Sequence, residues 1–362
     1  MCGHRPADQL CARAELGDTP ASARFVSVTR VASIPLDDEA FARRLEHQLG
    51  VVEARLHTAV AQADRLADDA SRHLVDAGGK RLRPALTLLA AELGDPGRPQ
   101  VVEAAVAVEL THLASLYHDD VMDSAPLRRG APSAHEVWGN TVAILTGDLL
   151  FARASATVAG LGAEAVRIHA ETFERLCLGQ LAETVGPAAG DDPTEHYLQV
   201  LSDKTASLVG TSARYGAMFA GCDERTVNIL AEFGERVGVA FQIADDYIDL
   251  VCDGALTGKT PGTDLREGVA TMPVLALRAL VASGEATDDD RALLAQLSGD
   301  LSCDDALADA VAALREHRVV EQTHARSAAL CREAVDLLAG LPAGPATDAL
   351  VAFAQVLVDR TA

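Results

Sequence analysis

Several features that mark common classes of protein are missing from this sequence of 362 residues. No uninterrupted apolar run approaches the roughly 20 residues that a helix needs to cross a bilayer. The seven cysteines have no CxxC or zinc-type spacing, which favours free thiols over a disulfide framework. The first residues contain no apolar segment of the kind found in secretory signals. We therefore expect a soluble, cytoplasmic protein without a membrane span.

Positive charge is also scarce. The chain has 31 Lys and Arg residues against 53 Asp and Glu residues, which gives a formal net charge of -22. Nucleic-acid binding needs a cationic surface that displaces counterions from phosphates, so a nucleic-acid partner is not expected. Any phosphate group that binds here must be held by a local basic cluster or by metal ions.

Apolar residues instead recur at spacings of three and four, and Ala and Leu are abundant. The pattern predicts helices over residues 41–77, 84–93, 100–123, 141–161 and 163–185, with breaks at clusters of Gly and Pro. Alternating strand patterns are nearly absent. We expect a disordered or poorly packed tail over residues 1–33 and one all-α domain over residues 34–362.

Two aspartate clusters lie about 125 residues apart, HDDVMD at 118–123 and QIADDYIDL at 242–250. On a helix, side chains at i and i+4 share a face, so Asp119 lies near Asp123 and Asp245 near Asp249. Carboxylates so close repel one another unless a cation lies between them, and Mg2+ prefers such oxygen ligands. The clusters predict a metal-bridged, polyanionic substrate.

Basic residues flank the first cluster. The segment GGKRLRP at 78–84 places three cations beside two glycines, which suits a diphosphate site at a helix junction. An alternative is a helix C-cap followed by solvated charges. Arg128 and Arg129 follow the cluster, and alone they fit an ordinary exposed loop. Together the two basic segments favour a phosphate site around the cluster.

Further motifs follow in a distinctive order. They are GGKRLRP, His112, HDDVMD, LRRG (127–130), GDLLFA (147–152), DKTASL (203–208), FQIADDYIDL (241–250), GKTPGTDLREG (258–268) and TMP (271–273). From about residue 35 onward the chain resembles the trans-type isoprenyl diphosphate synthases, also called polyprenyl synthetases. The resemblance implies a bundle of long antiparallel helices around a deep central cavity, a homodimer, and two aspartate clusters that face each other across the cavity mouth.

The resemblance also implies a role for each matching residue. The Mg2+ ligands would be Asp119, Asp123 and Asp245, with Asp120, Asp246 and Asp249 as further ligands or holders of water. Isopentenyl diphosphate would be held by Lys80, Arg83, His112 and Arg129. The allylic diphosphate would be held by Arg128, Lys204 and Lys259. Thr205 and Gln242 would line the reaction centre, and three Mg2+ ions per site are the usual complement.

The implied reaction is head-to-tail condensation of an allylic diphosphate with isopentenyl diphosphate, which forms a trans double bond. In the family that the chain resembles, the turn before the first cluster faces the growing product, and bulky side chains there stop elongation. Ala114 and Ser115 are small, so the resemblance implies a long product of roughly C30 to C50. The same small residues also suit close helix packing, and Tyr117 or another helix can block that path. Farnesyl or geranylgeranyl synthesis is therefore the alternative. Because the product is apolar, transient membrane contact is also expected.

One position departs from the family pattern. Many relatives carry a second lysine after the GK motif, whereas this chain has Val269, with Arg266 as an uncertain substitute. Two other functions are alternatives. A class I terpene cyclase normally has an Asn/Ser/Glu second metal motif, and a non-catalytic subunit of a heteromeric synthase usually has eroded aspartate motifs. Both motifs here are intact, which favours the synthase.

Overall fold

The computed structural model describes residues 34–36, 38–251, 261–266 and 268–359. The predicted tail, residues 1–33, and Lys259 lie outside the described residues. The elements in chain order are α1 (Glu39–Val60), α2 (Arg65–Asp76), α3 (Leu82–Ala91), α4 (Pro99–Met122), β1 (Leu127–Arg128), β2 (Ala131–Pro132), α5 (Ala134–Trp138), α6 (Asn140–Ala159), α7 (Ala163–Val185), α8 (Pro193–Leu201), the π turn η1 (Ser202–Ala206), α9 (Ser207–Ala220), α10 (Glu224–Val251), α12 (Thr263–Arg266), α13 (Met272–Ala282), α14 (Asp288–Leu297), α15 (Asp304–Arg315), α16 (Arg318–Leu337), the 3-10 turn η2 (Leu338–Gly340) and α17 (Pro345–Val358).

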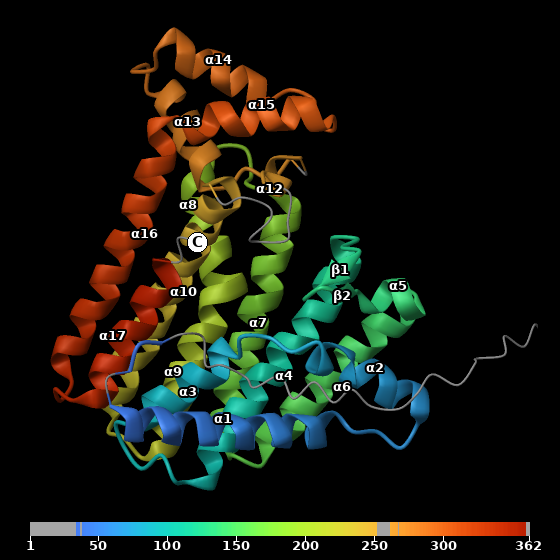
Figure 1. Cartoon of the computed structure of the whole chain (residues 1–362), viewed down its shortest axis with the longest axis vertical. Helices are drawn as coiled ribbons and strands as arrows, with labels where there is room; N and C mark the ends of the chain where they lie inside the picture. Colours follow the sequence, from blue (N-terminus) through green and yellow to red (C-terminus); the bar gives the residue numbers. More distant parts are fainter. Residues whose placement is uncertain (1–33, 37, 252–260, 267, 360–362) are drawn as a thin grey trace, which may run out of the picture.

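Long helices make up the body of the molecule. In Figure 1, α10 runs along the long axis and packs against both α9 and α16, while α4 packs against α6 and α9. Helix α1 closes the lower end in this view, and α13, α14 and α15 lie at the upper end. Among the described residues, the strands form one short hairpin. The prediction of an all-α bundle is confirmed.

Helix ends follow local chemistry in most places. The Asp38 side chain accepts hydrogen bonds from the N–H groups of Ala40 and Phe41 at the start of α1. Prolines open α4, α8, α13 and α17, where their missing N–H costs nothing.

The first predicted helix needs a correction. The pattern predicted one helix over residues 41–77, but the chain breaks between α1 and α2, and no glycine or proline marks the break. Instead, Asp64 accepts a hydrogen bond from Ala67 N at 3.0 Å, and Asp68 accepts one from Gln62 N at 2.8 Å. Two aspartate side chains therefore stabilise a turn that apolar periodicity does not reveal.

Two hydrophobic clusters support the ends of the site. In the large one, Leu45, Leu49, Val52 and Leu56 of α1 are buried at helical spacing beneath α3 and α4. The second cluster joins the end of α10 to the upper helices through residues such as Leu277 of α13. The bundle therefore fixes both ends of the long helices that carry the predicted site.

Candidate active site

The first aspartate cluster lies at the C-terminal end of α4. The helix dipole has its negative pole there, and the last turn has no basic residue. Asp119 is half-buried, whereas Asp123 is exposed and caps the helix. Burial raises the pKa of Asp119 to about 6; Lys204 lowers this pKa and Asp123 raises it further. The arrangement concentrates negative charge that a hard cation neutralises.

Asp120 makes a different contact from its neighbours in the cluster. Its side chain is fully buried, and Oδ1 accepts a hydrogen bond from Arg128 Nε at 2.6 Å. Its Oδ2 has no hydrogen-bond partner among the described residues. Burial raises the pKa of Asp120, and Arg128 opposes this shift. Asp120 therefore holds Arg128 beside the cluster.

A tight hairpin places the arginine pair. Leu127 pairs with Pro132 and Arg128 with Ala131, so the loop consists of Arg129 and Gly130. Both loop residues have positive φ, 55° and 79°, as a type I′ turn requires. Arg129 donates hydrogen bonds to the carbonyls of Leu74 and Gly78. The hairpin thus directs Arg128 to α4 and Arg129 to the loop between α2 and α3.

The second cluster lies in the last two turns of α10, and this helix also has no basic residue in its last turn. Asp245 and Asp249 are half-buried. Asp246 is buried, and its Oδ2 accepts hydrogen bonds from Tyr197 Oη at 2.7 Å and Met272 N at 3.0 Å. Burial raises the pKa of Asp246 to about 7, although the hydrogen bonds from Tyr197 and Met272 lower this pKa. Asp246 thereby ties α10 to α8 and α13.

Lys204 lies on the π turn η1 and forms an ion pair with Glu183 of α7. Its charge lowers the pKa of Asp119, at the end of α4. Such wide turns occur often at functional sites. Thr205 on the same turn and Gln242 on α10 are both half-buried.

A basic group that includes Arg83, His112 and Arg129 lies about two turns before the first cluster, beside Glu109 of α4. Burial lowers the pKa of Arg83 to about 10, and the nearby Arg129 lowers it further, while Glu109 and Asp119 oppose the shift. Arg83 Nε has no hydrogen-bond partner among the described residues. Burial and the surrounding arginines hold the pKa of His112 well below its usual value. Lys80, just before α3, is exposed.

These residues fit Mg2+ with a diphosphate. Within the described ranges, no three His, Cys, Asp or Glu side chains are placed to hold an ion by themselves. Mg2+ usually takes one or two carboxylates and completes its shell with water and substrate phosphates. Pairs such as Asp119 with Asp123, at the negative end of a helix, match that requirement.

Comparison with known proteins decides the family. The sequence profile described as Polyprenyl synthetase matches residues 64–314, more than half of the chain. The chain belongs to the polyprenyl synthetase family. A nonaprenyl diphosphate synthase of Mycobacterium tuberculosis is 44% identical over 334 residues, which cover 92% of this chain and 98% of that protein. A dimethylallyltranstransferase of the same organism is 38% identical over 79% of this chain and 85% of that protein.

Solved polyprenyl synthetase structures share the fold. The crystal structure of a geranylgeranyl pyrophosphate synthase from Corynebacterium glutamicum, complexed with calcium and isoprenyl diphosphate, matches with a TM-score of 0.80 and 39% identity over 90% of this chain and 99% of that chain. A decaprenyl diphosphate synthase from Rhodobacter capsulatus matches with a TM-score of 0.79 and 33% identity over 89% and 98% of the two chains. The predicted family and enzyme class, a prenyltransferase, are confirmed.

The predicted chain-length residues of this polyprenyl synthetase differ in exposure. Ala114 is fully buried in the main core, whereas Ser115 is half-buried and donates a hydrogen bond from Oγ to His112 O at 2.9 Å. Tyr117 is also fully buried, and its hydroxyl donates to Ala70 O of α2 and accepts from Leu74 N. The Tyr117 ring is therefore fixed against α2.

The segment after the second cluster contains Lys259, Arg266 and Val269, three positions that bear on diphosphate binding. Arg266 forms an ion pair with Asp304 of α15 at 2.5 Å, and Val269 is exposed. Lys259 is outside the described residues, so its predicted role stays a prediction. Arg266 is thus engaged with the upper helices.

Sequence reasoning missed three residues that support the site. Tyr197 contacts Asp246, Arg175 contacts the turn that carries Lys204, and Glu109 is buried beside the basic group. A signal existed for Glu109 alone, because an acid inside the apolar run of α4 needs a cationic partner.

Proposed function

We propose that this chain is a Mg2+-dependent trans-prenyltransferase that condenses an allylic diphosphate with isopentenyl diphosphate. The observation that carries this proposal is the arrangement along α4. His112 precedes Asp119 by about two helical turns, so both lie on nearly the same face of the helix. Asp119 also raises the pKa of Arg83, which places the basic group within electrostatic reach of the acidic cluster. One helix face thus joins a diphosphate site to a metal site.

Each group of residues has a distinct role in this proposal. Lys80, Arg83, His112 and Arg129 hold the diphosphate of isopentenyl diphosphate. The two aspartate clusters hold Mg2+, with Asp119, Asp123 and Asp245 as direct ligands. Arg128 and Lys204 bind the allylic diphosphate.

The chemistry explains why cations must surround the allylic diphosphate. Breaking the allylic C–O bond develops negative charge on the departing diphosphate. Lys204 and Arg128 interact with this charge and therefore stabilise the transition state more strongly than the ground state. When bound, Mg2+ supplies further positive charge to the same oxygens. The double bond of isopentenyl diphosphate attacks the allylic carbon, and the released diphosphate accepts the proton that is lost. No amino-acid nucleophile takes part.

We further propose a long product, of roughly C30 to C50, because Ala114 and Ser115, five and four residues before Asp119, are small. Support comes from Ser115, which is small and half-buried, and from Tyr117, whose ring is engaged with α2. The nonaprenyl and decaprenyl synthases among the similar proteins agree with this length. A geranylgeranyl pyrophosphate synthase is similar as well, so a short product is the second candidate.

We also propose a cytoplasmic homodimer. One described helix, α6, is long and apolar enough to cross a membrane, with a mean hydropathy of 1.4, yet it packs along α4. Only 33% of its apolar window is buried in the single chain. Large exposed apolar side chains gather on the N-terminal half of α6 and the C-terminal half of α7: Ile144, Leu145, Leu178, Leu181 and Val185. A second copy would cover this surface.

The reaction is tested with the purified protein alone. Farnesyl diphosphate, radiolabelled isopentenyl diphosphate and Mg2+ should give a labelled product of roughly C30 or longer on chromatography. A shorter product would support the second candidate, and a cyclic hydrocarbon would indicate a cyclase. No diphosphate release at all would favour a non-catalytic subunit. The variant Asp119→Ala should lower kcat by at least about a hundredfold; full activity would refute the metal assignment.

A further inference from the structure

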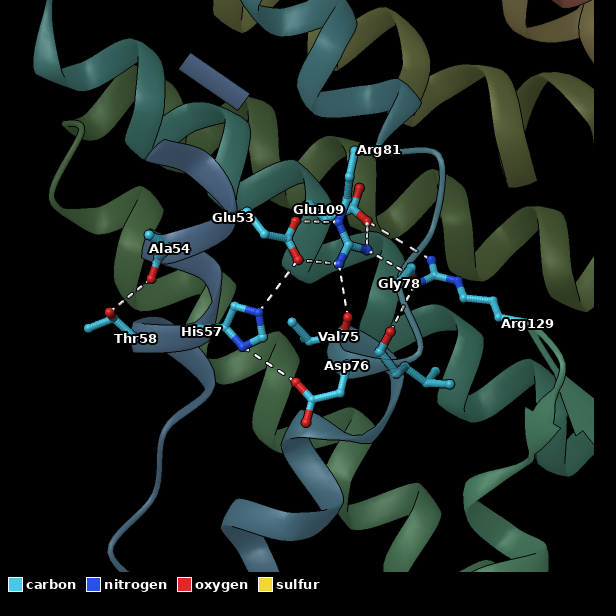
Figure 2. Close-up of polar contacts among 11 residues, drawn as sticks. Glu53, Ala54, His57, Thr58, Val75, Asp76, Gly78, Arg81, Glu109 and Arg129 are labelled. Carbon is cyan, nitrogen blue, oxygen red and sulfur yellow. Dashed lines mark hydrogen bonds and ion pairs between the residues drawn. The ribbon is translucent and has the colours of Figure 1, made fainter. Parts of the chain in front are cut away.

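Arg81 belongs to the GGKRLRP segment, but its side chain faces the protein interior and is 3% exposed. Figure 2 shows it between Glu53 of α1 and Glu109 of α4. Nε and Nη2 bind the two oxygens of Glu53, both at 2.8 Å, and Nη1 binds Glu109 Oε1 at 3.1 Å. The carbonyls of Gly78 and Val75 accept the two remaining N–H groups, each at 3.1 Å. Arg81 thus has all five donors engaged by protein.

The backbone at Arg81 is unusual as well. Its φ of 47° lies in the left-handed region, which costs a residue with a Cβ roughly 1 to 2 kcal/mol. Arg81 is the N-cap of α3 and has no side-chain capping bond, so the helix end does not explain this conformation. The five hydrogen bonds of the guanidinium hold it. Two residues later, Arg83 is the one basic residue of α3.

Glu109 is the shared counter-charge of this region. It is 1% exposed, and its Oε1 lies 3.1 Å from Arg81 Nη1 and 4.0 Å from Arg129 Nη2. The same carboxylate raises the pKa of Arg83. Three guanidinium groups, those of Arg81, Arg83 and Arg129, therefore surround two carboxylates, those of Glu53 and Glu109. Arg81 makes the close contacts, and Arg129 remains at the outer limit of an ion pair with Glu109 (Figure 2).

We propose that Arg81 is a positioning residue for the isopentenyl diphosphate site: it saturates Glu53 and Glu109, so that Arg83 and Arg129 stay directed at the diphosphate. The inference rests on the proposed function, which assigns Arg83 and Arg129 to that substrate. Without the Arg81 guanidinium, Glu109 is a buried carboxylate without a close partner, a state that is strongly unfavourable. The nearest cation, Arg129, then moves onto Glu109 and away from the substrate.

The test is a double-mutant cycle on Arg81 and Glu109. Arg81→Met should raise the KM for isopentenyl diphosphate by about ten- to one-hundredfold, because it withdraws a charged hydrogen-bonding group from the diphosphate. The KM for the allylic substrate should change by less than about threefold. In Arg81→Met/Glu109→Gln the buried charge is gone, so Arg129 is released and the KM for isopentenyl diphosphate should return to that of Glu109→Gln.

The KM separates positioning from stability, because a role of Arg81 in folding alone would lower Tm and the folded fraction but leave the KM of the folded enzyme unchanged. A double variant as weak as Arg81→Met would overturn the inference, as would an Arg81→Met protein with an unchanged KM. If Arg81→Met does not fold, calorimetric titration of isopentenyl diphosphate into Glu109→Gln and the double variant decides: equal affinity supports the inference, and a tenfold weaker double variant overturns it.

Two further variants serve as controls. Arg55 of α1 forms a bidentate pair with Glu103 of α4 at 2.7 and 3.0 Å, so it joins the same two helices away from the basic group. Arg55→Met should leave both KM values unchanged. Arg83→Gln tests the proposed function itself and should weaken isopentenyl diphosphate binding. If Arg83→Gln has no effect, the substrate assignment fails; if it weakens binding and Arg81→Met does not, only the inference fails.

Discussion

The imidazole of His112 is kept in its neutral form by its surroundings. Burial lowers its pKa well below the usual value, and Arg83, Arg129, Arg81 and Arg128 lower it further. A neutral imidazole binds a diphosphate as a hydrogen-bond donor and not as a cation. The charge of the site therefore comes from its arginines, with His112 as a polar partner among them.

A neutral role for His112 predicts which substitutions are tolerated. His112→Gln retains a neutral donor and should change the KM for isopentenyl diphosphate by less than about threefold, whereas His112→Leu should raise it by roughly tenfold. Because the folded pKa lies below 6.5, acid protonates the unfolded chain first, and stability falls as the pH drops through about 6.5. His112→Gln should flatten the fall of Tm between pH 7 and pH 5. A steeper fall would contradict the assignment.

Product length is the second question at the scale of single residues. Ser115→Phe should shorten the product, because its side chain is half-buried and a ring there extends into the path of the growing chain. Ala114→Phe should shorten it too, but Ala114 is fully buried, so the ring also overpacks the core and lowers Tm. Chromatography of the products, with Tm measured beside it, checks both. An unchanged length in Ser115→Phe would place the limit on another helix.

Among single residues, the sequence identified those that belong to a recognisable motif. Asp119 and His112 lie on the helix that the spacing predicted, whereas Arg83, predicted at a helix junction, lies in the first turn of α3. Arg81 was not distinguished from Lys80 and Arg83. The difference is that Arg81 pairs with Glu53 and Glu109, which lie far from it in the sequence. Burial depends on contacts between distant segments, which one sequence does not display.

At the scale of elements, the π turn η1 is the part of the site that depends most on its neighbours. Arg175 of α7 donates to Asp203 Oδ1 at 2.8 Å, to Ser202 Oγ at 3.0 Å and to Glu235 Oε1 of α10 at 2.6 Å. Glycines on both sides let the turn approach closely: a Cβ on Gly179 would lie 2.5 Å from Lys204 N. Contacts from α7 and α10 therefore set the position of Lys204.

Removing those contacts should lower kcat more than it weakens the binding of isopentenyl diphosphate. Arg175→Gln should lower kcat by roughly tenfold and raise the KM of the allylic substrate, while the KM for isopentenyl diphosphate changes little. Arg167→Gln is the matched control, because Arg167 also lies on α7 and pairs with two carboxylates, but at the surface. Equal effects of the two variants in steady-state kinetics would show that Arg175 only stabilises the helix.

Element boundaries were predicted where a local sequence signal marks them and missed where it does not. Breaks marked by Gly and Pro were predicted, and the hairpin loop at Arg129 and Gly130 falls at one of them. The break before α2 and the π turn were missed. No glycine or proline occupies either segment; instead, the Asp64 side chain accepts a hydrogen bond from Ala67 N, and the Arg175 side chain donates one to Asp203.

At the scale of the whole molecule, the exposed apolar surface on α6 and α7 is the feature that the single chain leaves unexplained. The two helices are joined by a short loop and pack antiparallel, so the start of α6 lies beside the end of α7. Leu145 is 60% exposed and Val185 is 82% exposed at that end. A surface of this kind is covered either by a second copy of the chain or by a lipid surface.

Charge placed on this surface distinguishes the two. Leu145→Glu should convert a dimer into a monomer, because a carboxylate in an apolar interface loses its hydration without gaining a partner. Light scattering after size-exclusion chromatography measures the change. Val51→Glu is the control, since Val51 is an exposed apolar residue on α1, 41% exposed and outside this surface. If the wild-type protein is already monomeric and Leu145→Glu instead weakens binding to phospholipid vesicles, the surface contacts membrane and the homodimer proposal is wrong.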